Sequence, residues 1–164
     1  MHLDMQTMSA VNVTVTAILG GVLVLTWARE REGPLVGWWG LALLVQATGV
    51  AIAALASPAN AGEVLAIGTA LIVLGDAVKW KAAREFAHRR ARLLWILLGP
   101  VGFLLPAQLG FLHSFDYRLS ALCSILAVYN FAAAFELSRA NGERLASRRP
   151  AVLLLVVVGL GYLS

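Results

Sequence analysis

The sequence predicts an all-α protein, a polytopic bundle of transmembrane helices, and three observations lead to this fold class. Hydrophobic residues make up 60% of the chain and charged residues only 13%, whereas a soluble domain has roughly 25% charged residues. The mean hydropathy is +0.79. The apolar residues also gather in runs close to the roughly 20 residues that a helix needs to cross a bilayer. We therefore treat residues 1–164 as a single transmembrane domain.

Six apolar runs follow one another along the chain, separated by charged segments or by segments with Gly and Pro. They predict helices at about residues 8–28, 35–56, 61–78, 93–112, 119–137 and 150–164. The separators are residues 29–34, 57–60, 79–92, 113–118 and 138–149. The basic segment 79–92 is assigned to a loop, although it is also suited to continue the third helix.

The last apolar run is shorter than a full membrane crossing. It spans residues 150–164 and carries no flanking charge at its end. We therefore expect the sixth helix to be incomplete here. In the parent protein we expect a seventh helix and then a cytoplasmic output domain after residue 164.

The basic residues predict the orientation of the bundle. Except for Arg118, every lysine and arginine lies in the segments 29–34, 79–92 and 138–149. Short cytoplasmic loops carry the excess of lysine and arginine, so these three loops should be cytoplasmic and the N-terminus outside. The positive charge fits the lipid bilayer as partner and not a nucleic acid, because a nucleic-acid-binding domain presents its basic face on a soluble body.

Two carboxylates lie one helical turn before a basic residue. Asp76 precedes Lys79, and Glu136 precedes Arg139, both at the i, i+3 spacing that brings side chains together on a helix. We interpret both pairs as interfacial ion pairs that anchor helix ends, with a switch or an ion site as the alternative. No ionisable residue is expected near a helix centre, which disfavours an ion-coupled transporter.

Uncharged polar residues inside the apolar runs are the candidates for ligand binding. An amide in hydrocarbon needs a partner, and a neighbouring helix usually provides it. Two interpretations remain open, hydrogen bonding between helices and a pocket for a small outer-side or lipid-borne ligand. Asn12 and Thr16 share a helix face at i, i+4 under either interpretation. The candidates are Asn12, Thr16, Gln46, Thr69, Gln108, Tyr129 and Asn130.

No catalytic residue, metal site or cofactor is expected. Cys123 is the single cysteine, so no disulfide framework or cysteine metal site can be formed within the chain. A haem between helices needs two histidines at the same depth. His88 is on the predicted cytoplasmic side, whereas His2 and His113 are on the outer side. No nucleophile motif or phosphate-binding loop occurs.

Several short segments, spread over almost the whole chain, carry a family resemblance. They are Val11-Asn12, Trp38-Trp39-Gly40, Ile67 to Leu71 with Gly75, Arg84-Glu85-Phe86, and Glu136 to Arg139 leading to Ser147 to Ala151. In spacing they resemble the N-terminal multi-helix membrane region that precedes GGDEF domains in bacterial diguanylate cyclases. The resemblance implies a sensor or anchor in the bacterial inner membrane. It would act as a homodimer and control a cytoplasmic enzyme that condenses GTP into cyclic di-GMP.

The chain itself is not expected to be an enzyme, because no GGDEF motif occurs in its sequence. The leading hypothesis is therefore a membrane sensory or anchoring module that regulates a C-terminal cytoplasmic signalling enzyme. The alternatives are a small membrane transporter or channel subunit, and a bare membrane anchor without a ligand.

Overall fold

A computed structural model describes residues 5–30, 34–57, 60–108, 114–139 and 148–163. All regular secondary structure in these residues is α-helical, as predicted, and it forms six helices. They are α1 (Met5–Glu30), α2 (Pro34–Ala54), α3 (Ala61–Phe86), α4 (Leu93–Gln108), α5 (Phe115–Arg139) and α6 (Arg148–Gly161).

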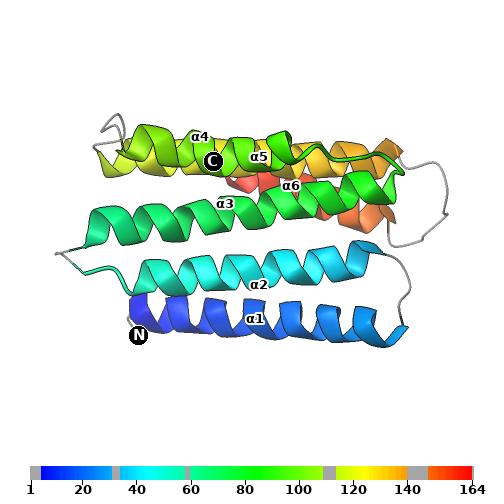
Figure 1. Ribbon diagram of the computed structural model, residues 1–164, viewed down its shortest axis with the longest axis horizontal. Coiled ribbons are helices and arrows are strands. Elements are labelled where there is room, and N and C mark those ends of the chain that lie inside the picture. Colours follow the sequence, from blue (N-terminus) through cyan, green and yellow to red (C-terminus); the bar gives the residue numbers. More distant parts are fainter. Residues whose placement is uncertain (1–4, 31–33, 58–59, 109–113, 140–147, 164) are drawn as a thin grey trace.

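Successive helices run in opposite directions, so the C-terminal ends of α1, α3 and α5 lie at one end of the bundle (Figure 1). The helices α1, α2 and α3 lie side by side, and α4 and α5 pack against α3. Among the described residues α1 contacts α2 alone, whereas α3 contacts α2, α4 and α5, and α6 packs on α5. The hydrophobic core lies mainly between α3 and α5, around Val73, Ala77 and Ala133. Helix α3 is therefore the centre of the bundle.

Four of the helices, α1, α2, α3 and α5, are long and apolar enough to cross a membrane. The other two are apolar but shorter, with 16 residues in α4 and 14 in α6. Helix α4 also contains Pro100 and Pro106, and a proline inside a helix removes one backbone hydrogen bond.

Helix α3 runs on to Phe86, past the predicted end at residue 78. The prediction of a loop is therefore wrong for residues 79–86, which are helical. Ala82 and Ala83 are fully buried and favour helix formation. Lys81 and Glu85 form an i, i+4 ion pair with 2.9 Å between Nζ and Oε1. The apolar and basic parts of α3 are therefore one continuous helix.

The end of α3 turns the chain back toward α5. His88 has a positive φ of 56°. The amide of His88 donates to the Glu85 carbonyl at 2.9 Å, and the amide of Arg89 donates to the Arg84 carbonyl at 2.9 Å. These two bonds form the Schellman motif that commonly ends helices, here with histidine where glycine is usual. Arg89 is thereby brought near Glu136 of α5.

Helices α2 and α3 approach closely at a pair of glycines. A Cβ atom added to Gly49 would lie 2.6 Å from the Gly68 carbonyl oxygen, and one added to Gly68 would lie 2.7 Å from the Gly49 oxygen. No real side chain fits at such distances, so both positions require glycine. Small residues allow close helix packing of this kind.

Replacing Gly68 by leucine should therefore destabilise the protein by about 1–3 kcal/mol, the usual cost of overpacking. Thermal unfolding of the detergent-solubilised protein, followed by circular dichroism, measures the effect. Gly62→Leu is the matched control, since it lies on the same helix with open space at its Cβ position. Equal stabilities of the two variants would contradict the proposed close contact.

Candidate functional site

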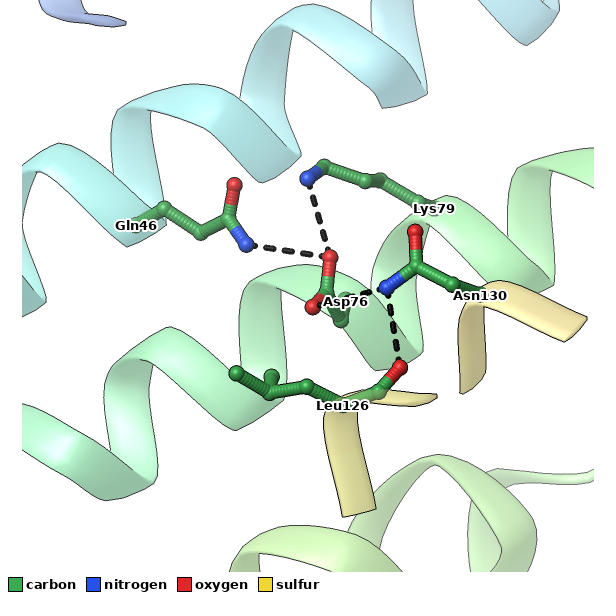
Figure 2. Close-up of polar contacts among 5 residues, drawn as sticks. All are labelled: Gln46, Asp76, Lys79, Leu126 and Asn130. Atoms are coloured by element: carbon green, nitrogen blue, oxygen red, sulfur yellow. Dashed lines mark hydrogen bonds and ion pairs between the residues drawn. The ribbon is translucent and has the colours of Figure 1, made fainter. Parts of the chain in front are cut away.

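The Asp76 carboxylate is the centre of a buried polar cluster. Asp76 is 2% exposed, and three donors converge on its two carboxylate oxygens (Figure 2). Oδ1 accepts from Gln46 Nε2 of α2 at 3.0 Å and from Lys79 Nζ at 2.9 Å. Oδ2 accepts from Asn130 Nδ2 of α5 at 3.4 Å. One carboxylate thus links α2, α3 and α5.

The partners of Asp76 balance the cost of its burial. A buried carboxylate is tolerated only when it is paired and hydrogen-bonded, and here Lys79 supplies the opposite charge. Asn130 is itself fixed, because its Nδ2 also donates to the Leu126 carbonyl at 2.8 Å. Gln46 comes close because Gly75 has no side chain: a Cβ there would lie 2.8 Å from a backbone oxygen of α2.

A second charged cluster lies nearer the end of α3. Glu136 of α5 is 7% exposed, and its Oε1 is 3.5 Å from Arg84 Nε. Its Oε2 is 3.7 Å from Arg89 Nη1. These distances are those of ion pairs and not of close hydrogen bonds, and Arg84 Nε and Glu136 Oε2 are both buried without a hydrogen-bond partner. The charges attract each other, but these polar atoms lack the hydrogen bonds that the Asp76 carboxylate has.

Trp80 lies between Asp76 and Arg84 on α3 and forms an aromatic pair with Tyr129 of α5. The rings of Trp80 and Tyr129 have centroids 6.2 Å apart and are tilted by 57°, within the distance range of aromatic pairs. Together these residues form what we call the polar interface between α3 and α5. It consists of Asp76, Trp80 and Arg84 on α3, and of Asn130, Tyr129 and Glu136 on α5.

The hydroxyl of Tyr129 extends this interface to α4. It donates to the Trp95 carbonyl at 2.9 Å and accepts from the Gly99 amide at 3.0 Å. Trp95 and Gly99 are four residues apart, the spacing of a helical hydrogen bond. The hydroxyl therefore bridges the two backbone groups of one turn of α4, directly before Pro100.

The predicted ligand-binding residues fall into separate places. Gln46 and Asn130 meet at Asp76, and Tyr129 lies beside them. Asn12 and Thr16 share a face, as expected from their spacing, and the Thr16 hydroxyl donates to Asn12 Oδ1 at 3.1 Å. They lie on α1, which contacts only α2 among the described residues.

The two remaining candidates lie on α3 and at the end of α4. Thr69 is half-buried on α3, two turns before Asp76. Gln108 lies at the end of α4, and its side chain lies outside the described residues. The predicted set is thus not one pocket.

The expectations for the carboxylates need two corrections. The ion pair of Asp76 with Lys79 is present, but Asp76 lies well inside α3, because this helix continues to Phe86. Glu136 does not pair as predicted with Arg139. It forms ion pairs with Arg84 of α3 and with Arg89 of the following turn. Arg139 stacks on Phe135, with its Cζ 4.4 Å from the ring centroid.

Sequence reasoning missed Trp80, Arg84 and Arg89 as members of the site. The spacing Asp76, Trp80, Arg84 was a usable signal, because residues four apart lie on one helix face. Among the described residues, no group of three His, Cys, Asp or Glu side chains is arranged to hold a metal ion. Comparison with family models, curated proteins and solved structures gave no match in any of the three.

The buried pair gives a stability prediction. Asp76→Ala leaves Lys79 without its partner and should lower the free energy of unfolding by about 3 kcal/mol, the scale of a broken buried ion pair. Glu63→Ala is the control, because Glu63 is exposed in the first turn of the same helix, where a carboxylate contributes about 0.3–1 kcal/mol. Chemical denaturation in mixed micelles measures both. Similar losses in the two variants would refute the central role of Asp76.

Proposed function

We propose that this chain is the membrane sensory or anchoring module of a bacterial signalling protein and regulates a cytoplasmic diguanylate cyclase. One observation carries the proposal, the polar interface between α3 and α5. It contains two buried carboxylates in an otherwise apolar core. It also runs along α3 into the basic end of that helix, which is continuous with the apolar part. The identity of the output enzyme rests on the resemblance of the short sequence segments.

The membrane location is supported by the four helices that are long and apolar enough to cross a bilayer. The C-terminal ends of α1, α3 and α5 lie together (Figure 1), and the last turns of these helices carry Arg29, Arg84 and Arg139. We propose that this end faces the cytoplasm of a bacterial inner membrane, with the N-terminus outside. The working form is a homodimer, as the cyclase requires.

The proposed mechanism is a shift between two arrangements of α3 and α5. A ligand can move such an equilibrium only by binding one arrangement more tightly. In the interface, Arg84 and Glu136 are within ion-pair distance but not hydrogen-bonded, so a small displacement changes their pairing. Because α3 continues into the basic segment, its movement would reach the cytoplasmic end directly.

One observation favours the alternative of an ion-coupled transporter. Asp76 is an ionisable residue buried inside the bundle, and its partner Lys79 is half-buried. Ionisable residues at such depth mark ion or proton pathways in many membrane proteins. However, Asp76 has three donors from the protein, which accounts for it as a structural link. Proton uptake into vesicles that contain the purified protein separates the two functions, since only the transporter predicts uptake that Asp76→Asn abolishes.

The proposed topology predicts the behaviour of reporter fusions. Alkaline phosphatase, active only outside the cytoplasm, should be active when fused within residues 57–60 and inactive within residues 87–92. A green fluorescent reporter, which needs the cytoplasm, should give the reverse pattern. Activity of the phosphatase at residues 87–92 would overturn the orientation.

The polar interface predicts a change in output when its charges are altered. In the full-length protein, Glu136→Gln should change cellular cyclic di-GMP by about 2- to 30-fold, the range of a coupling change of 0.5–2 kcal/mol. Exchange of the two charges, Arg84→Glu with Glu136→Arg, should restore part of the original level. Glu85→Gln is the matched control, because Glu85 pairs with Lys81 on its own helix.

Equal output from the Glu136→Gln and Glu85→Gln variants, at equal amounts in the membrane, would contradict transmission through the polar interface. The coding sequence downstream of Ser164 tests the output enzyme separately. A further apolar run followed by a GGDEF segment supports the proposal. A stop codon, or more helices without a soluble domain, contradicts it.

A further inference from the structure

A cavity of about 550 Å³ lies between α4 and α5, where both helices pack on α3 but make few contacts with each other. Its volume is within the roughly 300–1,000 Å³ of ligand pockets. Its lining includes Trp80, Trp95, Gly99, Gly102, Val128 and Tyr129.

The lining of this cavity is suited to hydrocarbon. It consists of aromatic and aliphatic side chains with two hydroxyls, and both hydroxyl donors are already used. Tyr129 donates to the Trp95 carbonyl at 2.9 Å, and Ser124 donates to the Ser120 carbonyl at 2.7 Å. The other polar hydrogens on the lining side chains are the indole N–H groups of Trp80 and Trp95. The lining is therefore mainly apolar, and water is poorly held in an apolar cavity.

The opening of the cavity is bordered by exposed apolar residues. Leu98 of α4 is 57% exposed and Val128 of α5 is 65% exposed, and both line the cavity. In the proposed membrane location these side chains face the acyl chains of the bilayer, so a chain reaches the cavity sideways without crossing water. A hydrophobic space of this size, open to hydrocarbon, is filled by hydrocarbon.

The glycines of α4 shape the cavity. A Cβ atom on Gly99 would lie 2.6 Å from the Tyr129 hydroxyl oxygen, so glycine is needed for Tyr129 to reach the α4 backbone. A Cβ on Gly102 meets nothing within 4 Å, and Gly102 lines the cavity. Gly99 thus allows Tyr129 to bind the α4 backbone, and Gly102 leaves space inside the cavity.

We propose that the cavity between α4 and α5 binds one acyl chain of a bilayer phospholipid. The inference rests on the proposed membrane location but not on the identity of the output enzyme. Its floor includes Trp80 and Tyr129 of the polar interface. A bound acyl chain therefore contacts the same residues that join α3 to α5, and it makes lipid the input of the sensory module.

Quenching of tryptophan fluorescence by brominated acyl chains tests this proposal. Trp80 is buried, so an acyl chain reaches it through the cavity. The full-length protein, with the other four tryptophans of this region replaced by phenylalanine, is placed in vesicles of phosphatidylcholine with or without brominated chains. We expect a loss of Trp80 fluorescence in the brominated vesicles.

Two further variants in the same background make the test specific. Gly102→Leu fills the cavity and should restore the fluorescence. Gly21→Leu, a glycine of α1 that also has open space at its Cβ position, should leave the quenching unchanged. Equal quenching with and without the Gly102→Leu substitution would overturn the proposal. Unquenched Trp80, as expected if another helix or a second copy fills the cavity, would overturn it as well.

A variant that keeps only Trp27 separates this result from failure of the membrane location. Trp27 is exposed on α1 and is not part of the cavity. If Trp27 is quenched and Trp80 is not, the lipid site is wrong and the membrane location stands. If neither tryptophan is quenched, both the lipid site and the membrane location are wrong.

Should the multiple substitutions prevent folding, the unaltered protein is crosslinked instead with a phospholipid that carries a photoreactive acyl chain. Labelling of Gly102 and Val128 then supports the site, and its absence there overturns it.

Discussion

The negative charge of Asp76 is enclosed by helices whose buried residues are otherwise almost all apolar. A carboxylate in such surroundings is stable only if opposite charge and hydrogen-bond donors are held against it. This requirement fixes three helices at once. Gln46 must face inward on α2, Asn130 on α5, and Lys79 must fold back along α3. Because the donors come from different helices, the carboxylate sets the rotation of each helix about its axis in a way that apolar packing alone does not.

The second carboxylate extends the same constraint toward the basic end of α3. Glu136 faces Arg84 and Arg89, and Arg89 reaches it because the chain turns at His88. The two clusters differ in quality. Asp76 has close hydrogen bonds, whereas one carboxylate oxygen of Glu136 has an ion-pair contact with Arg89 but no hydrogen-bond partner. The first cluster therefore acts as a fixed point, and the second is the part of the interface that rearranges at lower cost.

The all-helical fold and the positions of the helices could be predicted from the sequence, because long runs of apolar residues can be recognised without tertiary information. The end of α3 could not be predicted from hydropathy. Residues 79–86 are basic, and their helix is stabilised by alanines and by the pair of Lys81 with Glu85. Local spacing correctly gave the pair of Asp76 with Lys79. It failed for Glu136, whose partners lie about 50 residues earlier in the chain. Spacing also gave no sign that the Tyr129 hydroxyl bridges two backbone groups of α4.

The order of helix contacts has a consequence for biosynthesis. In the described part of the chain, every packed pair of helices is adjacent in sequence except α3 and α5. Asp76 and Asn130 are separated by 54 residues, which a ribosome adds in about 3–11 s at roughly 5–20 residues per second. During that interval α1 to α4 can already associate. Asp76 then has Lys79 and Gln46 but not Asn130, and Arg84 lacks Glu136. The nascent chain thus passes through a stage in which the charge of Arg84 has no partner on α5. A chain that has lost α5 keeps Arg84 without its partner Glu136.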